Sequence, residues 1–97
     1  ILFDDLVDTA GSLCNAAAAL VEVGGAEKVY ACASHGVLSG PALERVENSY
    51  IEELMVLNTI PMPAGYTGGK IKQLDVAPLF AKAINRVYTE TSISSLF

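Results

Sequence analysis

The chain has 97 residues, 52% of them hydrophobic, and a formal net charge of −5 with only six lysines and arginines. This length suits one small domain, and the high apolar content predicts that some apolar surface remains for a partner. The sequence offers no basic stripe that could neutralise a phosphate backbone, so we expect no nucleic-acid binding. No apolar run approaches the roughly 18 residues that span a bilayer, so we expect no membrane segment.

The first half of the chain alternates strand and helix patterns. Residues 1–3 read as the end of a strand, and residues 4–12 as a loop. Residues 10–23 place apolar side chains on one helical face, and the two glycines that follow end the helix. Residues 28–33 read as a buried strand.

The second half continues the alternation. A Gly-Pro pair opens a helix, with proline at a first-turn position, and a segment rich in glycine and proline predicts a loop. In chain order the sequence predicts a helix over 40–47, a strand over 53–57, a loop over 61–69, a strand over 71–76, a helix opening at Pro78 and a tail over 92–97. This alternation predicts an α/β fold with a largely parallel sheet. The chain starts without methionine inside a strand-like run, which favours one incomplete domain over residues 1–97.

The stretch that follows the first strand is the most informative. Two carboxylates, Asp4 and Asp5, precede the sequence Asp8-Thr9-Ala10-Gly11-Ser12, which opens the first helix. Backbone N–H groups at a helix start can hold a phosphate, whereas carboxylates accept hydrogen bonds from hydroxyls. The sequence therefore predicts a site for a sugar phosphate at the carboxyl end of a strand, where parallel sheets bind ligands.

Residues 3–12 resemble the ribose-phosphate-binding motif of type I phosphoribosyltransferase-fold proteins. Further blocks at 34–42, 58–61, 70–71 and 92–97 resemble, in order, one branch of that fold, the ribose-phosphate diphosphokinases or phosphoribosyl pyrophosphate synthetases. The resemblance covers nearly the whole chain. It implies part of a doubly wound, mostly parallel, phosphoribosyltransferase-like sheet, and it implies that the chain is the C-terminal segment of such an enzyme.

The resemblance also implies roles for individual residues. Asp4 would contact the ribose of ribose 5-phosphate, and Asp5 would lie behind Asp4 without touching the ligand. The 5-phosphate would be wrapped mainly by backbone N–H groups of the segment Asp8, Thr9, Ala10, Gly11 and Ser12. Ser12 stands where the family usually has threonine, and because the hydroxyl is kept we expect a small effect.

Enzymes of this family transfer diphosphate from ATP to ribose 5-phosphate with Mg²⁺. Their ATP loops, catalytic lysine and metal ligands have no match in residues 1–97, so we expect no catalytic or metal-binding residue here and an inactive isolated segment. The resemblance implies a cytoplasmic homo-oligomer, typically a hexamer. It also implies a regulatory phosphate or ADP site that includes Ser92 and Ser94, and a subunit contact at Phe97.

Two other functions stay open: a type I phosphoribosyltransferase that consumes phosphoribosyl pyrophosphate, and a catalytically silent regulatory relative. The remaining motifs have simpler interpretations. The glycines at 65–70 lack P-loop spacing, His35 reads as a loop or packing residue, and Arg45 as a solvated helix residue. Cys14 and Cys32 have no metal-ligand spacing, so we expect both to be buried and reduced.

Overall fold

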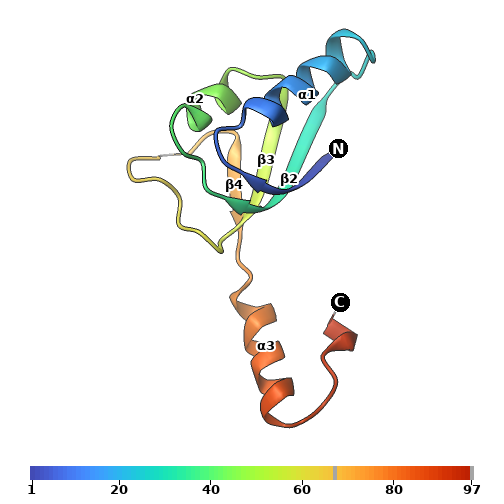
Figure 1. The fold of residues 1–97 in the computed structure, drawn as a ribbon, viewed down its shortest axis with the longest axis vertical. Coiled ribbons are helices and arrows are strands. Elements are labelled where there is room, and N and C mark those ends of the chain that lie inside the picture. The colour runs from blue at the N-terminus through green and yellow to red at the C-terminus, as the bar shows by residue number, and fades with distance from the viewer. Residues whose placement is uncertain (67, 97) are drawn as a thin grey trace.

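A four-stranded sheet, in which all neighbouring strands run parallel, organises the computed structural model (Figure 1). The strands are β1 (Leu2–Val7), β2 (Val29–Gly36), β3 (Ile51–Leu57) and β4 (Ile71–Leu74), and they lie in this order across the sheet. The structure describes residues 1–66 and 68–96. The predicted α/β class with a parallel sheet is confirmed.

Two helices connect the first three strands. Helix α1 (Gly11–Glu22) joins β1 to β2, and α2 (Ala42–Glu47) joins β2 to β3. Each crossover adds the next strand in the same direction, and right-handed crossovers of this kind place their helices on the same face of the sheet. The two helices accordingly contact each other on that face (Figure 1).

The hydrophobic core lies between this face and the two helices. Ile51 and Leu54 of β3 are fully buried, as are Ala17 of α1 and Val46 of α2. The small side chain at position 17 lets α1 approach the sheet closely, and the branched residues of β3 fill the space beneath α2. A strand packed this tightly fixes the positions of the loops that leave its carboxyl end.

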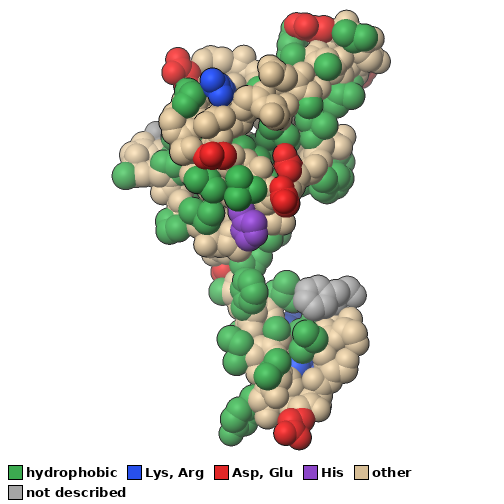
Figure 2. Space-filling view, viewed as in Figure 1, with side chains coloured by type: hydrophobic (Ala, Val, Ile, Leu, Met, Phe, Trp, Pro, Cys, Tyr) green, Lys and Arg blue, Asp and Glu red, His purple; other side chains and the backbone are tan. Residues whose placement is uncertain are grey.

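Helix α3 (Ala77–Tyr88) follows β4 and is followed by a short 3₁₀ turn, η1 (Ser94–Leu96). In Figure 1, α3 extends away from the sheet, and the only element that it contacts substantially in the described part of the chain is η1. Its apolar stripe is exposed: Phe80 is 55% accessible, Ile84 69% and Tyr88 86%. Figure 2 shows hydrophobic side chains at the surface of the lower part of the molecule, where α3 lies. The predicted spare apolar surface is thus present.

The first strand is longer than the sequence indicated. Asp4 and Asp5 belong to β1, not to the loop that was predicted from residue 4 onward. Asp4 pairs with Ala33 and Leu6 pairs with His35, so the backbone ladder extends the strand to Val7 despite the low strand propensity of aspartate. Because β1 is at the edge of the sheet, its carboxylates stay exposed to water.

The second strand also extends further, through His35, which the sequence placed outside the strand. The other boundaries shift by one or two residues, because pairing with β2 starts β3 at Ile51 and pairing with β3 ends β4 at Leu74. Thr67 of the predicted 61–69 loop and Phe97, the expected subunit contact, lie outside the described residues.

The prediction that both cysteines are buried was wrong. Cys14 and Cys32 are free thiols of intermediate exposure. Cys14 faces a groove between α1 and α2, and Cys32 lies on the sheet face that carries neither α1 nor α2, beside Phe3 and Met55. Neither position is covered by a further layer of the described chain, which explains the partial exposure.

Candidate functional site

The segment between β1 and α1 encloses a small cavity at the carboxyl end of the first strand. Its volume is about 200 Å³. The lining residues are Asp4, Leu6, Val7, Asp8, Thr9, Ala10, Gly11, Ser12 and Leu13. The structure therefore brings all six predicted substrate-binding residues to one cavity, although Asp4 reaches it from the strand. Asp5 is not among the lining residues; its backbone N–H donates to the Asp4 carboxylate at 2.8 Å.

The start of α1 leaves backbone donors at this cavity. The first hydrogen bond of the helix runs from the N–H of Cys14 to the carbonyl of Ala10 at 3.0 Å. The N–H groups of residues 11–13 precede that bond and have no helical acceptor. No side chain of the described residues caps the helix, and Thr9 and Ser12 are exposed to solvent. An anion bound here would meet these donors together with the positive end of the helix dipole.

Ala10 gives the loop its shape. Its backbone has φ 65° and ψ 10°, the left-handed conformation, and its side chain is only 5% exposed. A residue with a Cβ adopts this conformation at a cost of about 1–2 kcal/mol. Such strain persists only where the surroundings hold it in place, so the contacts that hold this loop are part of the site.

One set of contacts comes from the segment between β2 and α2. The N–H groups of Val37 and Leu38 both donate to the carbonyl of Val7, at 3.0 and 3.1 Å. Ser39 donates its N–H to the carbonyl of Asp8 at 2.9 Å and its hydroxyl to the Asp8 carboxylate. The Asp8 carboxylate is thereby held by a hydroxyl from the segment between β2 and α2.

Sequence reasoning did not single out Ser39 as a functional residue. It lies 31 positions from Asp8, and no local pattern links the two. The available signal was that Ser39 follows the second predicted strand and precedes the next helix, since such loops lie at the carboxyl ends of parallel strands, where ligands bind.

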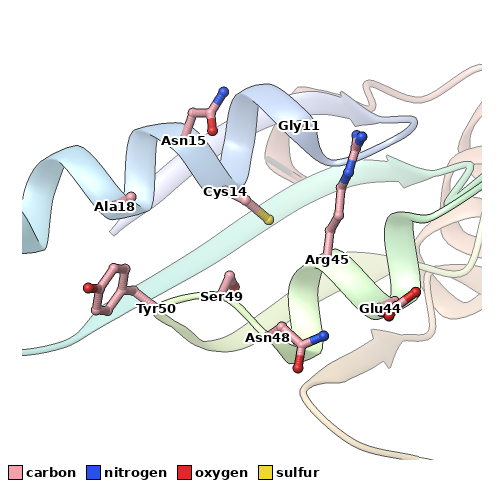
Figure 3. Close-up of a pocket in the computed structure, with 9 residues that line it drawn as sticks. All are labelled: Gly11, Cys14, Asn15, Ala18, Glu44, Arg45, Asn48, Ser49 and Tyr50. Atoms are coloured by element: carbon pink, nitrogen blue, oxygen red, sulfur yellow. The ribbon is translucent and has the colours of Figure 1, made fainter.

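A second contact comes from Arg45 of α2. Its side chain is exposed, as predicted, but its Nη1 donates to the carbonyl of Thr9 at 3.2 Å. Figure 3 shows Arg45 reaching from α2 toward Gly11 at the start of α1. It stands at one end of a groove of about 570 Å³ between the two helices, also lined by Cys14 and Asn15. The groove and the loop cavity share Gly11.

At the far end of this groove, the Tyr50 hydroxyl donates to the Glu22 carboxylate at 2.9 Å. That hydrogen bond, followed by the Glu22 charge and slight burial, raises the pKa of Tyr50 above its ordinary value. The pair ties the end of α1 to the start of β3 and lies away from the loop cavity.

The other predicted positions do not reach the cavity. Ser92 and Ser94 lie beyond α3, with their hydroxyl oxygens 2.6 Å apart. Arg86 donates from Nη1 to the carbonyl of Ser92 and to the hydroxyl of Ser95, both at 2.8 Å. His35 Nδ1 lies 2.7 Å from the Thr59 hydroxyl, at the carboxyl end of β2.

Within residues 1–66 and 68–96, no three His, Cys, Asp or Glu side chains come together as metal ligands. In the same part of the chain, none of the helices has the length and hydropathy needed to cross a membrane.

Comparison with known proteins gives the family. The model of the phosphoribosyl synthetase-associated domain matches residues 1–97. The chain belongs to this family. It is 58% identical to the ribose-phosphate pyrophosphokinase of Clostridium perfringens and 55% identical to that of Bacillus subtilis, in each case over all 97 residues.

A solved structure supports the assignment. The crystal structure of phosphoribosylpyrophosphate synthetase from Mycobacterium smegmatis superposes on 92% of the chain with a TM-score of 0.85 and 37% identity. This phosphoribosyl synthetase-associated domain spans about 30% of the length of each of these relatives.

Proposed function

We propose that this chain is the ribose 5-phosphate-binding part of a ribose-phosphate pyrophosphokinase, the enzyme that transfers diphosphate from ATP to ribose 5-phosphate. The observation that carries the proposal is the loop cavity, which is lined both by a strand carboxylate, Asp4, and by the residues that open α1. The names of the relatives, ribose-phosphate pyrophosphokinase and phosphoribosylpyrophosphate synthetase, support this substrate class.

The two sides of the cavity suit the two ends of a sugar phosphate. Backbone amides of Gly11 and Ser12, with the Thr9 and Ser12 hydroxyls, donate to the phosphate oxygens. Charge-assisted hydrogen bonds of this kind contribute about 1.5–3 kcal/mol each, and the helix end adds about 0.3–1 kcal/mol. Asp4 cannot donate to phosphate, so it accepts from the ribose hydroxyls. The volume of about 200 Å³ suits a ligand smaller than a drug-sized molecule.

The proposal places the remaining machinery outside this segment. Phosphoryl transfer depends mainly on positioning and on charge stabilisation, and the cavity supplies the position of the acceptor sugar phosphate. Mg²⁺, when bound, would supply charge neutralisation. We assign the metal ligands and the ATP site to other parts of a longer protein, of which we propose this to be the C-terminal segment, and we expect no synthesis by the segment alone.

Assembly and regulation belong to the same proposal. Exposed apolar side chains of α3, such as Ile84, leave a surface for association with a partner, and we propose a cytoplasmic homo-oligomer, a hexamer. Ser92 and Ser94 are proposed to contribute to a regulatory phosphate or ADP site, and the neighbouring guanidinium of Arg86 supplies a positive charge there.

Isothermal titration calorimetry on the full-length protein tests the substrate assignment. Ribose 5-phosphate should bind at least tenfold more tightly than ribose. Asp4→Ala should weaken binding of ribose 5-phosphate more than binding of inorganic phosphate. Asp5→Ala is the matched control: the backbone N–H that Asp5 gives to Asp4 survives the substitution, so its effect should be smaller. Equal losses for both ligands in Asp4→Ala would refute the division between sugar and phosphate contacts.

A further inference from the structure

Arg45 combines three features that a solvated surface arginine does not need. It lies 36 residues from Thr9 along the chain, yet its Nη1 donates to the Thr9 carbonyl at 3.2 Å. It approaches α1 at Gly11, where an added Cβ would lie only 3.2 Å from Nη1. It also reaches the loop out of the groove between α1 and α2, which shares only Gly11 with the loop cavity (Figure 3).

The Thr9 carbonyl and the Ala10 N–H belong to one peptide group. In a planar trans peptide these two groups point in opposite directions. A donor that holds the carbonyl toward α2 therefore turns the Ala10 N–H away from α2, and Ala10 itself lines the loop cavity. The left-handed backbone of Ala10 needs such an external restraint, because the residue does not favour this conformation by itself.

We propose that Arg45 is a positioning residue for the phosphate loop: its guanidinium holds the Thr9 carbonyl on the α2 side and so directs the Ala10 N–H at the bound phosphate. This role rests on the proposed function and adds a residue to it. The guanidinium also places a fixed positive charge behind the loop, which favours a dianion over a neutral ligand.

The role can be tested on the full-length protein with three variants. Arg45→Met removes the donor and the charge, and Arg45→Lys keeps the charge and one donor on a different head group. Lys28→Met removes one exposed positive charge just before β2, at the end of the parallel sheet opposite to the loop. Calorimetry gives the dissociation constant for ribose 5-phosphate and for ATP, and thermal unfolding reports the fold.

Arg45→Met should raise the dissociation constant for ribose 5-phosphate about tenfold, which corresponds to about 1.4 kcal/mol. Arg45→Lys should raise it about threefold, and Lys28→Met should leave it within twofold of the wild-type value. Binding of ATP should not change in any variant. If Arg45→Met does not fold, the test is the dissociation constant of Arg45→Lys for ribose 5-phosphate, which should exceed that of Lys28→Met.

A change below twofold in Arg45→Met, or equal losses for ribose 5-phosphate and ATP, would overturn the role of Arg45, because the first shows no contribution and the second shows a general structural effect. Wild-type protein that does not prefer ribose 5-phosphate to ribose would instead overturn the proposed function itself, and the role of Arg45 with it. The two failures are thus distinguished by the wild-type titration.

Discussion

The hydrogen bond between Ser39 and Asp8 bears on the repulsion between the Asp8 carboxylate and a bound phosphate in the proposed site. Asp8 is a carboxylate in a loop that is proposed to bind a dianion, and the Ser39 hydroxyl donates to it. If this bond holds the carboxylate away from the phosphate, then Ser39→Ala should weaken binding of ribose 5-phosphate. The backbone bond from the Ser39 N–H to the Asp8 carbonyl at 2.9 Å remains in the variant, so the loop itself should stay in place.

The size of the effect follows from two contributions. A hydrogen bond to a charged group contributes about 1.5–3 kcal/mol when shielded from water, but both side chains are exposed, so about 1 kcal/mol is the better figure here. A carboxylate that is free to rotate toward a phosphate charge about 4 Å away is repelled by about 1 kcal/mol in water. The two contributions overlap, and together they predict a loss of about 1–1.5 kcal/mol, or roughly tenfold in the dissociation constant.

The assay is a double-mutant cycle measured by calorimetry on the full-length protein. The four proteins are the wild type, Ser39→Ala, Asp8→Asn and the double variant. In the Asp8→Asn background the side chain is neutral, so removal of the Ser39 hydroxyl should cost less than threefold in affinity. Ser34→Ala is a matched control, because Ser34 is an exposed serine of the neighbouring strand β2 that does not line the loop cavity.

The reasoning is refuted if Ser39→Ala weakens binding equally in the presence and in the absence of the Asp8 charge. Such a result would mean that the hydroxyl acts through the fold of the loop and not through the carboxylate. Unchanged affinity in Ser39→Ala alone would be equally decisive, since it would show that Asp8 needs no restraint beside a bound phosphate.

Two further predictions concern the ends of the strands. Gly36→Ala should lower the free energy of unfolding by about 1–3 kcal/mol, because the added Cβ would lie 3.1–3.3 Å from the side-chain carbons of buried Val56; an unchanged midpoint in urea denaturation would contradict this. The backbone N–H of Ala77, followed by the side-chain amide of Asn58, holds the pKa of Asp75 below its ordinary value of 3.8. The ionised carboxylate therefore stabilises the start of α3 above pH 3.8, and this stabilisation is lost as the pH falls through the lowered pKa. The hydrogen-exchange protection factor of the Ala77 amide, corrected for the intrinsic rate, should therefore fall in that acidic range, and a constant value down to pH 2 would count against the contact.

The sequence was sufficient to predict the local features of the chain, namely its first helix, its strand and helix order and its candidate loop. The hydrophobic periodicity of residues 10–23 predicted α1 within one residue at each end, because a helix is stabilised by contacts between residues three and four apart. The order of strand and helix patterns predicted the parallel sheet, and the residues Asp8 to Ser12 marked the candidate loop. These features depend on neighbours along the chain, so the sequence contains them directly.

What surrounds the loop was decided only by the tertiary structure. Three contacts join segments about 30 residues apart. They are the pairing of β1 with β2, the hydrogen bond from the Ser39 hydroxyl to Asp8, and the hydrogen bond from Arg45 to the Thr9 carbonyl. Such contacts depend on strand register and on the path of α2, which a pattern of single residues does not specify. The sequence by itself therefore determined which residues could bind a phosphate, and the packing of α2 against α1 decided which distant side chains hold them in place.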